Sequence, residues 1–129
     1  MENLLPYFHI RHVQTGETIW HEGESSPFLA FVERGKIKLT KSTEFNNHQV
    51  VVGVIGKGSL IGDFCMFEGN RFSTTATAME YSLLGLLDQE KFQKILEDNS
   101  ELGIRLLKEM VNSTSSQLCQ AFDRLIHLF

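Results

Sequence analysis

Residues 61–76, IGDFCMFEGNRFSTTA, combine residue types that can hold a small anion. Asp63 follows Gly62 directly, Arg71 comes nine positions after that glycine, and a run of hydroxyl residues begins at Ser73. An arginine guanidinium can bind a phosphate or carboxylate through two hydrogen bonds, and hydroxyl and backbone N–H groups can complete such a cradle. The spacing therefore predicts a loop that binds a small, negatively charged molecule.

Catalytic and metal-binding chemistry finds little support elsewhere in the sequence. Metal-dependent oxygenases and isomerases of the cupin kind need a closely spaced His-x-His pair, which does not occur, and no Ser-His-Asp, Cys-His or paired-carboxylate arrangement stands out. No cysteine precedes Cys65, which argues against an N-terminal iron–sulfur cluster. An axial haem ligand stays open, although exposed, non-liganding side chains are the default for the five histidines at positions 9, 12, 21, 48 and 127. We therefore predict no catalytic residue, no enzymatic activity and no metal site.

Length and charge limit the kinds of partner. A chain of 129 residues fits one domain that buries roughly two-thirds of the surface exposed by its unfolded form. The net charge of −4 lacks the basic excess that releases counterions from nucleic acid, so this chain alone is expected to bind DNA poorly. Cys65 and Cys119 lie far apart, which suits reduced thiols, and no apolar run approaches the ~18 residues that span a bilayer. We predict a cytoplasmic protein with no membrane partner.

Short strands, separated by turn signals rich in Gly, Asn, Ser and Pro, occupy most of the sequence before residue 88. The strand-like segments are rich in β-branched or aromatic residues, and several alternate apolar with polar residues. A further strand is expected around His9 and His12. Strands at this spacing predict a mainly β protein, a double-stranded β-helix or jelly roll. The other expected strands are Thr18–Trp20, Phe28–Val32, Lys36–Thr40, Gln49–Ile55, Thr74–Met79 and Ser82–Leu87.

Two helices are expected after the strands. Asp88 can cap a short helix with one apolar face, formed by Phe92, Ile95 and Leu96. Asn99 or Ser100 can cap a second, longer helix, which contains no proline and is expected to run to Phe129. The chain thus changes from a mainly β part to a helical end.

The long helix carries a seam with alternating spacings of four and three residues, the pattern of a coiled coil. Two interpretations are open: this face packs onto the protein's own barrel, or it pairs with a second copy. A helix of about 28 residues is some 40 Å long at ~1.5 Å per residue, longer than one face of so small a barrel. We therefore predict a homodimer whose interface contains Leu107, Val111, Thr114, Leu118, Ala121, Leu125 and Leu128.

Three motifs, in this order, resemble the cyclic-nucleotide-binding domain of the CRP/FNR transcription regulators. Residues 16–24, GETIWHEGE, are similar to that family's opening strand and turn, and residues 31–39, FVERGKIKL, are similar to its next hairpin. Residues 58–63, GSLIGD, resemble the G-x-x-(F/I)-G-E entry to its phosphate-binding cassette. The resemblance covers nearly the whole chain. It implies a jelly-roll barrel, a short helix and a long dimerisation helix, followed by a winged helix-turn-helix domain that this chain lacks.

The resemblance also assigns roles within the cassette. In cyclic-nucleotide binders of that family, an acid after the second glycine bonds the ribose, and an arginine neutralises the cyclic phosphate. Asp63 takes the acid position with one methylene less reach. Alignment without a gap to the strand at residues 74–80 puts Phe72 at the arginine position, and Arg71 then faces the opposite side of the extended chain.

The energetic cost of an arginine that does not reach the phosphate decides which kind of effector is favoured. A buried phosphate left unpaired costs about 3–5 kcal/mol, or two to three orders of magnitude in affinity. Three alternatives are open: a cyclic nucleotide, with Arg71 returned to the pocket by a one-residue deletion in the preceding turn; another small effector, anionic or not, which we favour; and an empty pocket. No other cofactor is expected. The predicted ligand-binding residues are Gly62, Asp63, Phe64, Cys65, Arg71, Phe72, Ser73, Thr74 and Thr114.

The run Ser113-Thr114-Ser115-Ser116 interrupts the long helix with mediocre helix formers. In the resembled regulators this part of the helix lies over the effector pocket of both subunits. One interpretation is a solvated helix face or a looser seam. The other, functional one is that Thr114 touches the ligand or its dimer mate and so reports occupancy.

Together these features predict the effector-sensing and dimerisation domain of a CRP/FNR-like DNA-binding transcription regulator. Residues 1–98 are expected to form the sensing barrel with its short helix, and residues 99–129 the long helix of the same unit. DNA is contacted only through the domain that is absent here. The alternative is a stand-alone cyclic-nucleotide-binding module that regulates a partner protein through its exposed helix.

Overall fold

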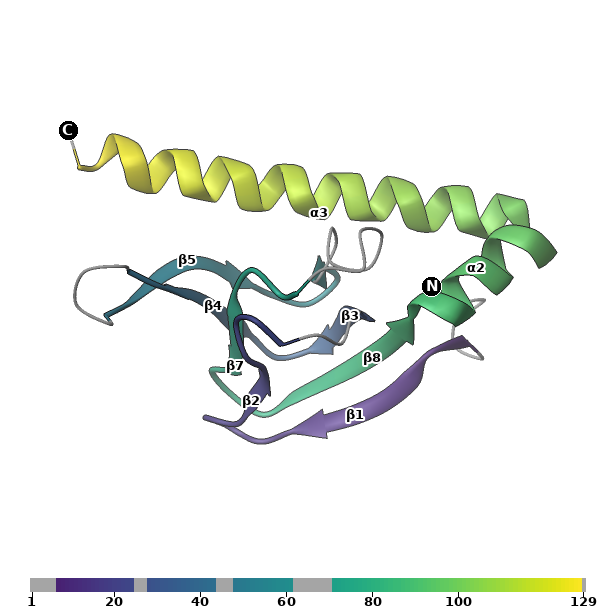
Figure 1. The fold of residues 1–129 in the computed structure, drawn as a ribbon, viewed down its shortest axis with the longest axis horizontal. Helices are drawn as coiled ribbons and strands as arrows, with labels where there is room; N and C mark the ends of the chain where they lie inside the picture. Colours follow the sequence, from purple (N-terminus) through teal and green to yellow (C-terminus); the bar gives the residue numbers. More distant parts are fainter. Residues whose placement is uncertain (1–6, 25–27, 44–47, 62–70, 129) are drawn as a thin grey trace.

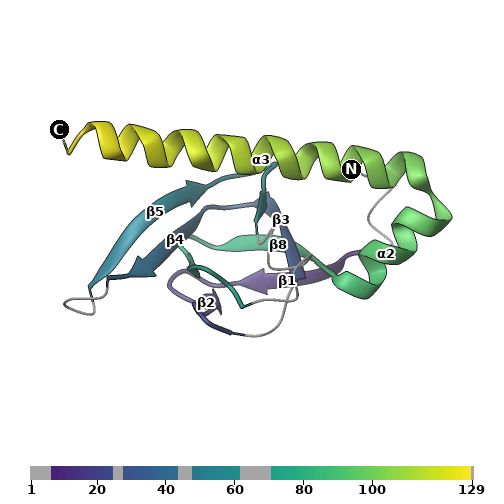
Figure 2. The ribbon, with the colours of Figure 1, turned by 45° about the horizontal axis from the view of Figure 1, so that its top comes forward.

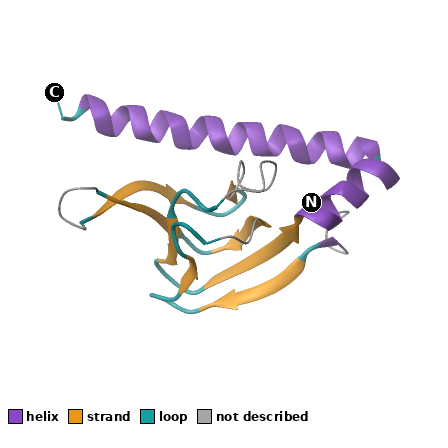
Figure 3. Cartoon of the chain, viewed as in Figure 1, coloured by secondary structure: helices purple, strands orange, loops and turns teal. Residues whose placement is uncertain are grey.

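The computed structural model describes residues 7–24, 28–43, 48–61 and 71–128, and it places them in two four-stranded sheets and two helices (Figure 1). One sheet has the strand order β1-β8-β3-β6 and the other β2-β7-β4-β5, with antiparallel pairing throughout. The mainly β jelly roll is thus confirmed, with the helices after the strands (Figure 3). The elements are β1 (His9–Val13), β2 (Thr18–Trp20), β3 (Phe28–Arg34), β4 (Ile37–Ser42), β5 (Gln49–Ile55), β6 (Leu60–Ile61), β7 (Thr75–Ala78), β8 (Ser82–Asp88), α2 (Gln89–Asp98) and α3 (Ser100–Ile126).

The sheet that contains β3 is covered on both faces, which explains why its central strands read as almost continuous apolar runs. In β3, Ala30 and Val32 belong to the core between the two sheets. Leu29 and Phe31 belong to a second apolar cluster, to which α2 contributes Phe92. Figure 2 shows α2 directly after β8 and the start of α3 above it. The helices therefore close one outer face of the barrel.

Both helices begin where the sequence predicts. Asp88 and Asn99 each accept a hydrogen bond from the backbone N–H three residues further on, at 2.8 and 3.3 Å. These caps satisfy N–H groups that the first turn of a helix leaves unpaired. Gly103 lets the two helices approach closely, because a Cβ at that position would lie 2.6 Å from a methyl carbon of Leu96.

Several strands differ by one or two residues from the predicted bounds, because their pairing partners decide where they end. β3 continues past Val32 to Arg34, which pairs with β8. β4 continues to Ser42, because Gln49 of β5 lies opposite. The two-residue strand β6 was not predicted at all, since it is formed by pairing with β3 and carries no periodicity of its own.

α3 crosses the sheets from α2 toward the hairpin between β4 and β5 (Figure 1). Its 27 residues correspond to about 40 Å. The helix ends at Ile126, which corrects the predicted end at Phe129; Phe129 itself lies outside the described residues. His127 and Leu128 form a turn, and Leu128 is 79% exposed, so no buried contact within the described chain prolongs the helix.

Candidate functional site

A cavity of about 240 Å³ lies between the barrel and the middle of α3. This volume is just below the ~300–1,000 Å³ that is typical of small-molecule sites. Strands β2, β4, β5 and β6 and the segment before β7 form one wall, and α3 forms the other. None of the described lining residues carries a charge. They are Trp20, Leu39, Val52, Ile61, Phe72, Ser73, Thr74, Thr114, Gln117 and Leu118.

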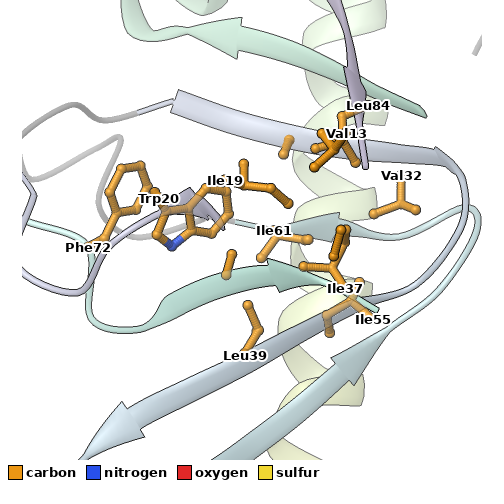
Figure 4. Close-up of a cluster of buried hydrophobic side chains, with 13 residues drawn as sticks. Val13, Ile19, Trp20, Val32, Ile37, Leu39, Ile55, Ile61, Phe72 and Leu84 are labelled. Atoms are coloured by element: carbon orange, nitrogen blue, oxygen red, sulfur yellow. The ribbon is translucent and has the colours of Figure 1, made fainter. Parts of the chain in front are cut away.

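Trp20 and Phe72 form an aromatic wall of this cavity (Figure 4). Their rings stack with centroids 4.5 Å apart, and Phe28 packs edge-on against both. The main chain holds Phe72 in place, because its N–H donates to the carbonyl of Glu24 and its carbonyl accepts from the N–H of Gly23. Phe72 is 3% exposed as a result. Phe72, which takes the arginine position of the resembled cassette when the alignment has no gap, is therefore a core aromatic residue.

Arg71, one position earlier, is exposed. Its Nη1 donates a hydrogen bond of 2.9 Å to the carbonyl oxygen of Gly23. Arg71 is not among the described residues that line the cavity. The placement agrees with the expectation that Arg71 and Phe72 face opposite sides, whereas contact between Arg71 and an effector stays a prediction.

The other predicted ligand-binding residues fall into two groups. Ser73, Thr74 and Thr114 line the cavity together with Phe72, although their contact with an effector is untested. The cassette residues Gly62, Asp63, Phe64 and Cys65 lie outside the described residues.

The sequence did not single out the rest of the lining. The alternation in β4 that turns Leu39 inward was visible, but no pattern shows which inward residues border a cavity. The remaining ones are Trp20, Val52, Ile61 and Gln117, while Leu118 had been assigned only to the dimer seam.

An ion pair lies beside the cavity wall. Lys41 Nζ donates to the carbonyl of Ser73 at 2.9 Å and lies 3.4 Å from Glu22 Oε2. The other oxygen of Glu22 accepts from the N–H of Ser42 at 2.9 Å, and the N–H of Glu22 donates to Thr75 Oγ1. The hydrogen bond from Ser42 is the main reason that the pKa of Glu22 lies below its ordinary value, and Lys41 adds to the effect. This network ties β2 and β4 to the segment that carries Ser73.

We expect Glu22→Gln to lower the free energy of unfolding at pH 7 by about 0.5–1 kcal/mol, since a neutral amide is a weaker acceptor and loses the pairing with Lys41. Because the folded-state pKa of Glu22 is lowered, its carboxylate stabilises the fold above the unfolded pKa, and this contribution is lost as the pH falls through the folded pKa. Urea unfolding should show the difference disappearing below the ordinary glutamate range near ~4.3. The exposed Glu33→Gln serves as the control. A difference that persists unchanged into strong acid would contradict this role.

Side-chain-to-main-chain hydrogen bonds attach α3 to two edge strands of the barrel. Ser113 Oγ accepts from the N–H of Leu60 in β6 at 3.0 Å, and Gln117 Nε2 donates to the carbonyl of the same residue at 3.3 Å. Gln120 bonds both the N–H and the carbonyl of Val54 in β5, at 3.2 and 3.4 Å. These bonds satisfy main-chain groups that edge strands leave unpaired, and they fix α3 as a wall of the cavity.

Most of the predicted seam lies on a different face of α3 from the one that packs on the barrel, although Leu107 packs against the second apolar cluster. Most seam residues directly follow a residue that faces the barrel, which turns the side chain by about 100° around the helix axis. Val111, Leu118 and Leu125 are 64%, 52% and 51% exposed. Packing on the barrel is therefore provided mainly by the neighbouring face, and pairing of the seam with a second copy stays a prediction. Thr114 and Leu118 belong both to the seam and to the cavity lining.

Candidate metal sites and membrane-spanning helices are absent from the part of the chain that the structure describes. Within the described ranges, no three His, Cys, Asp or Glu side chains gather where they could hold a metal ion. No helix in that part of the chain combines the length and the apolar character needed to cross a membrane.

A family model described as the cyclic nucleotide-binding domain matches residues 10–99. The matched range begins within β1 and ends after α2, so it contains the barrel wall of the cavity. The matched range stops immediately before α3.

Relatives and solved structures extend this comparison. The chain is 32% identical over 92 residues to the voltage-gated delayed rectifier potassium channel KCNH1 of Homo sapiens, which covers 70% of this chain and 9% of the channel. It is 22% identical over 111 residues to the cAMP-activated global transcriptional regulator CRP of Salmonella typhimurium, which covers 85% of this chain and 52% of that regulator. The chain thus spans less than a tenth of the length of the channel and about half of the length of the regulator CRP.

The structure of the c-di-GMP responsive global regulator CLP from Xanthomonas campestris is similar with a TM-score of 0.90 at 19% identity, covering 98% of this chain and 62% of that one. Coverage this high includes the long helix, so the two proteins share one fold across barrel and α3.

Proposed function

The chain belongs to the cyclic nucleotide-binding domain family, and from this premise we propose that it is the effector-sensing and dimerisation unit of a CRP/FNR-like transcription regulator. Residues 1–98 are the sensing barrel with its short helix, and residues 99–129 are the long helix of that unit. The observation that carries the proposal is the cavity shared by the barrel and α3. DNA contact belongs to a further domain outside these 129 residues, since a chain with a net charge of −4 lacks the basic excess that displaces counterions from nucleic acid.

The proposed effector is a small molecule bound in this cavity. By their names, CRP is activated by cAMP and CLP responds to c-di-GMP, so family membership leaves the effector of this chain open. The described lining offers aromatic, aliphatic, hydroxyl and amide groups without a charge, and Phe72 is packed where the resembled cassette has its arginine. These features favour an effector that does not depend on an arginine–phosphate pair.

Effector binding in the cavity affects the dimer interface through Thr114 and Leu118, which line the cavity and lie on the seam. A ligand shifts an equilibrium only by its differential affinity for the two states. An effector that contacts these two side chains favours the arrangement of the paired helices that fits it. The paired surface consists of Leu107, Val111, Thr114, Leu118, Ala121, Leu125 and Leu128.

A second candidate is a cyclic-nucleotide-binding module that regulates a partner protein through α3. The relation to KCNH1, which is a channel, favours this candidate. The reading frame downstream of Phe129 separates the two, because a basic helix-turn-helix continuation supports the transcription regulator and any other continuation supports the module.

Calorimetric titration with cyclic AMP, cyclic GMP, cyclic di-GMP, adenosine and guanosine tests the sensing function. We expect saturable binding of at least one of them, accompanied by a change in the fluorescence of Trp20, which is the single tryptophan of the chain and lies in the cavity wall. Thr114→Leu should weaken that binding about 10-fold by narrowing the cavity, whereas the exposed Ser116→Leu should not. Failure of all five compounds to bind would contradict the proposal.

A further inference from the structure

We propose that the indole N–H of Trp20 is the hydrogen-bond donor that recognises the effector, and that the effector presents to it an acceptor atom of an uncharged heterocycle, either a ring nitrogen or a ring carbonyl. The inference rests on the proposed function, because it requires a small molecule in the cavity. It names the chemical class of that molecule and the atom that selects it.

The first observation is an unpaired buried donor. Trp20 is 1% exposed, and its Nε1 is buried with no hydrogen-bond partner among the described residues. Buried tryptophan N–H groups usually have a partner, and a buried donor without one carries an unrecovered desolvation cost. The missing hydrogen-bond partner is explained if the effector supplies the acceptor when it binds.

The second observation is the rigid placement of this donor at the cavity. Trp20 lines the cavity, its ring stacks on Phe72 at 4.5 Å, and Phe28 packs against its edge at 5.5 Å. In Figure 4 the nitrogen lies on the edge of the indole turned toward Leu39, which also lines the cavity, and away from Ile19. A donor fixed in this way loses little freedom on binding, so its bond contributes to selectivity.

The third observation is the character of the surrounding wall. Leu39, Val52 and Ile61 make it apolar, and none of the described lining residues is charged. A charged group placed there would lose hydration, and the described lining side chains would offer it no opposite charge. An uncharged heterocycle avoids that cost, offers an acceptor to the indole, and leaves its other polar atoms for the hydroxyl and amide groups of Ser73, Thr74, Thr114 and Gln117.

The first test needs no ligand. Replacing the Trp20 indole by 3-benzothienylalanine substitutes sulfur for the N–H and keeps the ring size. If the N–H is unpaired in the free protein, the urea midpoint should stay unchanged or rise. A lower midpoint would show that the N–H already has a partner, such as a trapped water, and would overturn the inference. Trp20→Phe does not replace this isostere, because the smaller ring leaves a cavity in the core and lowers the midpoint by itself. The same sulfur analogue placed at Phe122, on the exposed part of α3, is the control.

The second test uses adenosine and guanosine, which are uncharged heterocycles with ring-nitrogen and carbonyl acceptors. We expect the sulfur variant to bind them about 10-fold more weakly than the natural chain. Because Trp20 is the single tryptophan, its indole gives one peak in a ¹⁵N–¹H correlation spectrum, and ligand should shift that proton downfield.

The binding results distinguish a failure of the proposed role of Trp20 from a failure of the proposed sensing function. Equal nucleoside binding by both proteins overturns the role of Trp20 and leaves effector sensing intact. Binding of cyclic nucleotides without binding of nucleosides overturns the proposal that the effector is an uncharged heterocycle. Binding of neither kind contradicts the sensing function itself and the inference with it.

Discussion

Phe72→Ala is expected to lower the free energy of unfolding by about 3–5 kcal/mol, the usual cost of removing a buried phenylalanine ring. Phe72 is 3% exposed and packs against both Trp20 and Phe28, so its loss opens a hole in the aromatic wall. Urea unfolding followed by the fluorescence of Trp20 measures the change. Because 3–5 kcal/mol is a large share of a typical domain's stability, Phe72→Leu provides a milder variant that should remain folded.

Arg71→Ala is the matched control, one residue away. Arg71 is exposed and donates to the carbonyl of Gly23, so its removal should cost at most about 1 kcal/mol. Comparable losses of unfolding free energy in the two alanine variants would contradict the assignment of Phe72 to the core and of Arg71 to the surface.

Val111→Glu combined with Leu125→Glu is expected to weaken dimerisation at least about 100-fold. Both side chains are more than half exposed on the seam of α3, and pairing would bury the introduced carboxylates without counterions. Multi-angle light scattering should give the natural chain twice the sequence mass of 14.7 kDa and the double variant the single mass. Folding of the variant can be checked independently by the fluorescence of Trp20, which lies in the barrel.

Asn112→Glu combined with Ser116→Glu adds the same charge to exposed positions of α3 off the seam, and this control should remain a dimer. A natural chain that keeps a mass near 14.7 kDa at high concentration would show that the seam does not pair. Loss of the dimer in the control as well would point to net charge rather than to the seam.

Much of the fold could be predicted because its signals are local. Inward alternation in β4 and the cap residues Asp88 and Asn99 act over a few residues, and the structure contains each of them. β6 could not be predicted, because Leu60 and Ile61 form a strand only through pairing with β3. The end of α3 likewise depends on which contacts are available beyond Ile126.

Fewer features of the site could be predicted from the sequence. The one-residue offset between Arg71 and Phe72 followed from strand periodicity. Thr114 lines the cavity, and its contact with an effector stays a prediction. By contrast, no role was predicted for Gln117 or Gln120, because their partners are main-chain groups of distant strands. Together with Ser113 they follow spacings of four and three residues, one position before the seam, and this was the available signal.

The most direct test of an effector site without an arginine–phosphate pair is calorimetric titration of the natural chain and of Arg71→Ala with cyclic AMP and cyclic GMP. Because Arg71 bonds Gly23 and Phe72 is packed at the wall, we predict no micromolar binding that depends on Arg71. The affinity of any nucleotide that binds should be the same in both proteins. Micromolar binding of a cyclic nucleotide that disappears in Arg71→Ala would contradict this conclusion and restore Arg71 as the phosphate ligand.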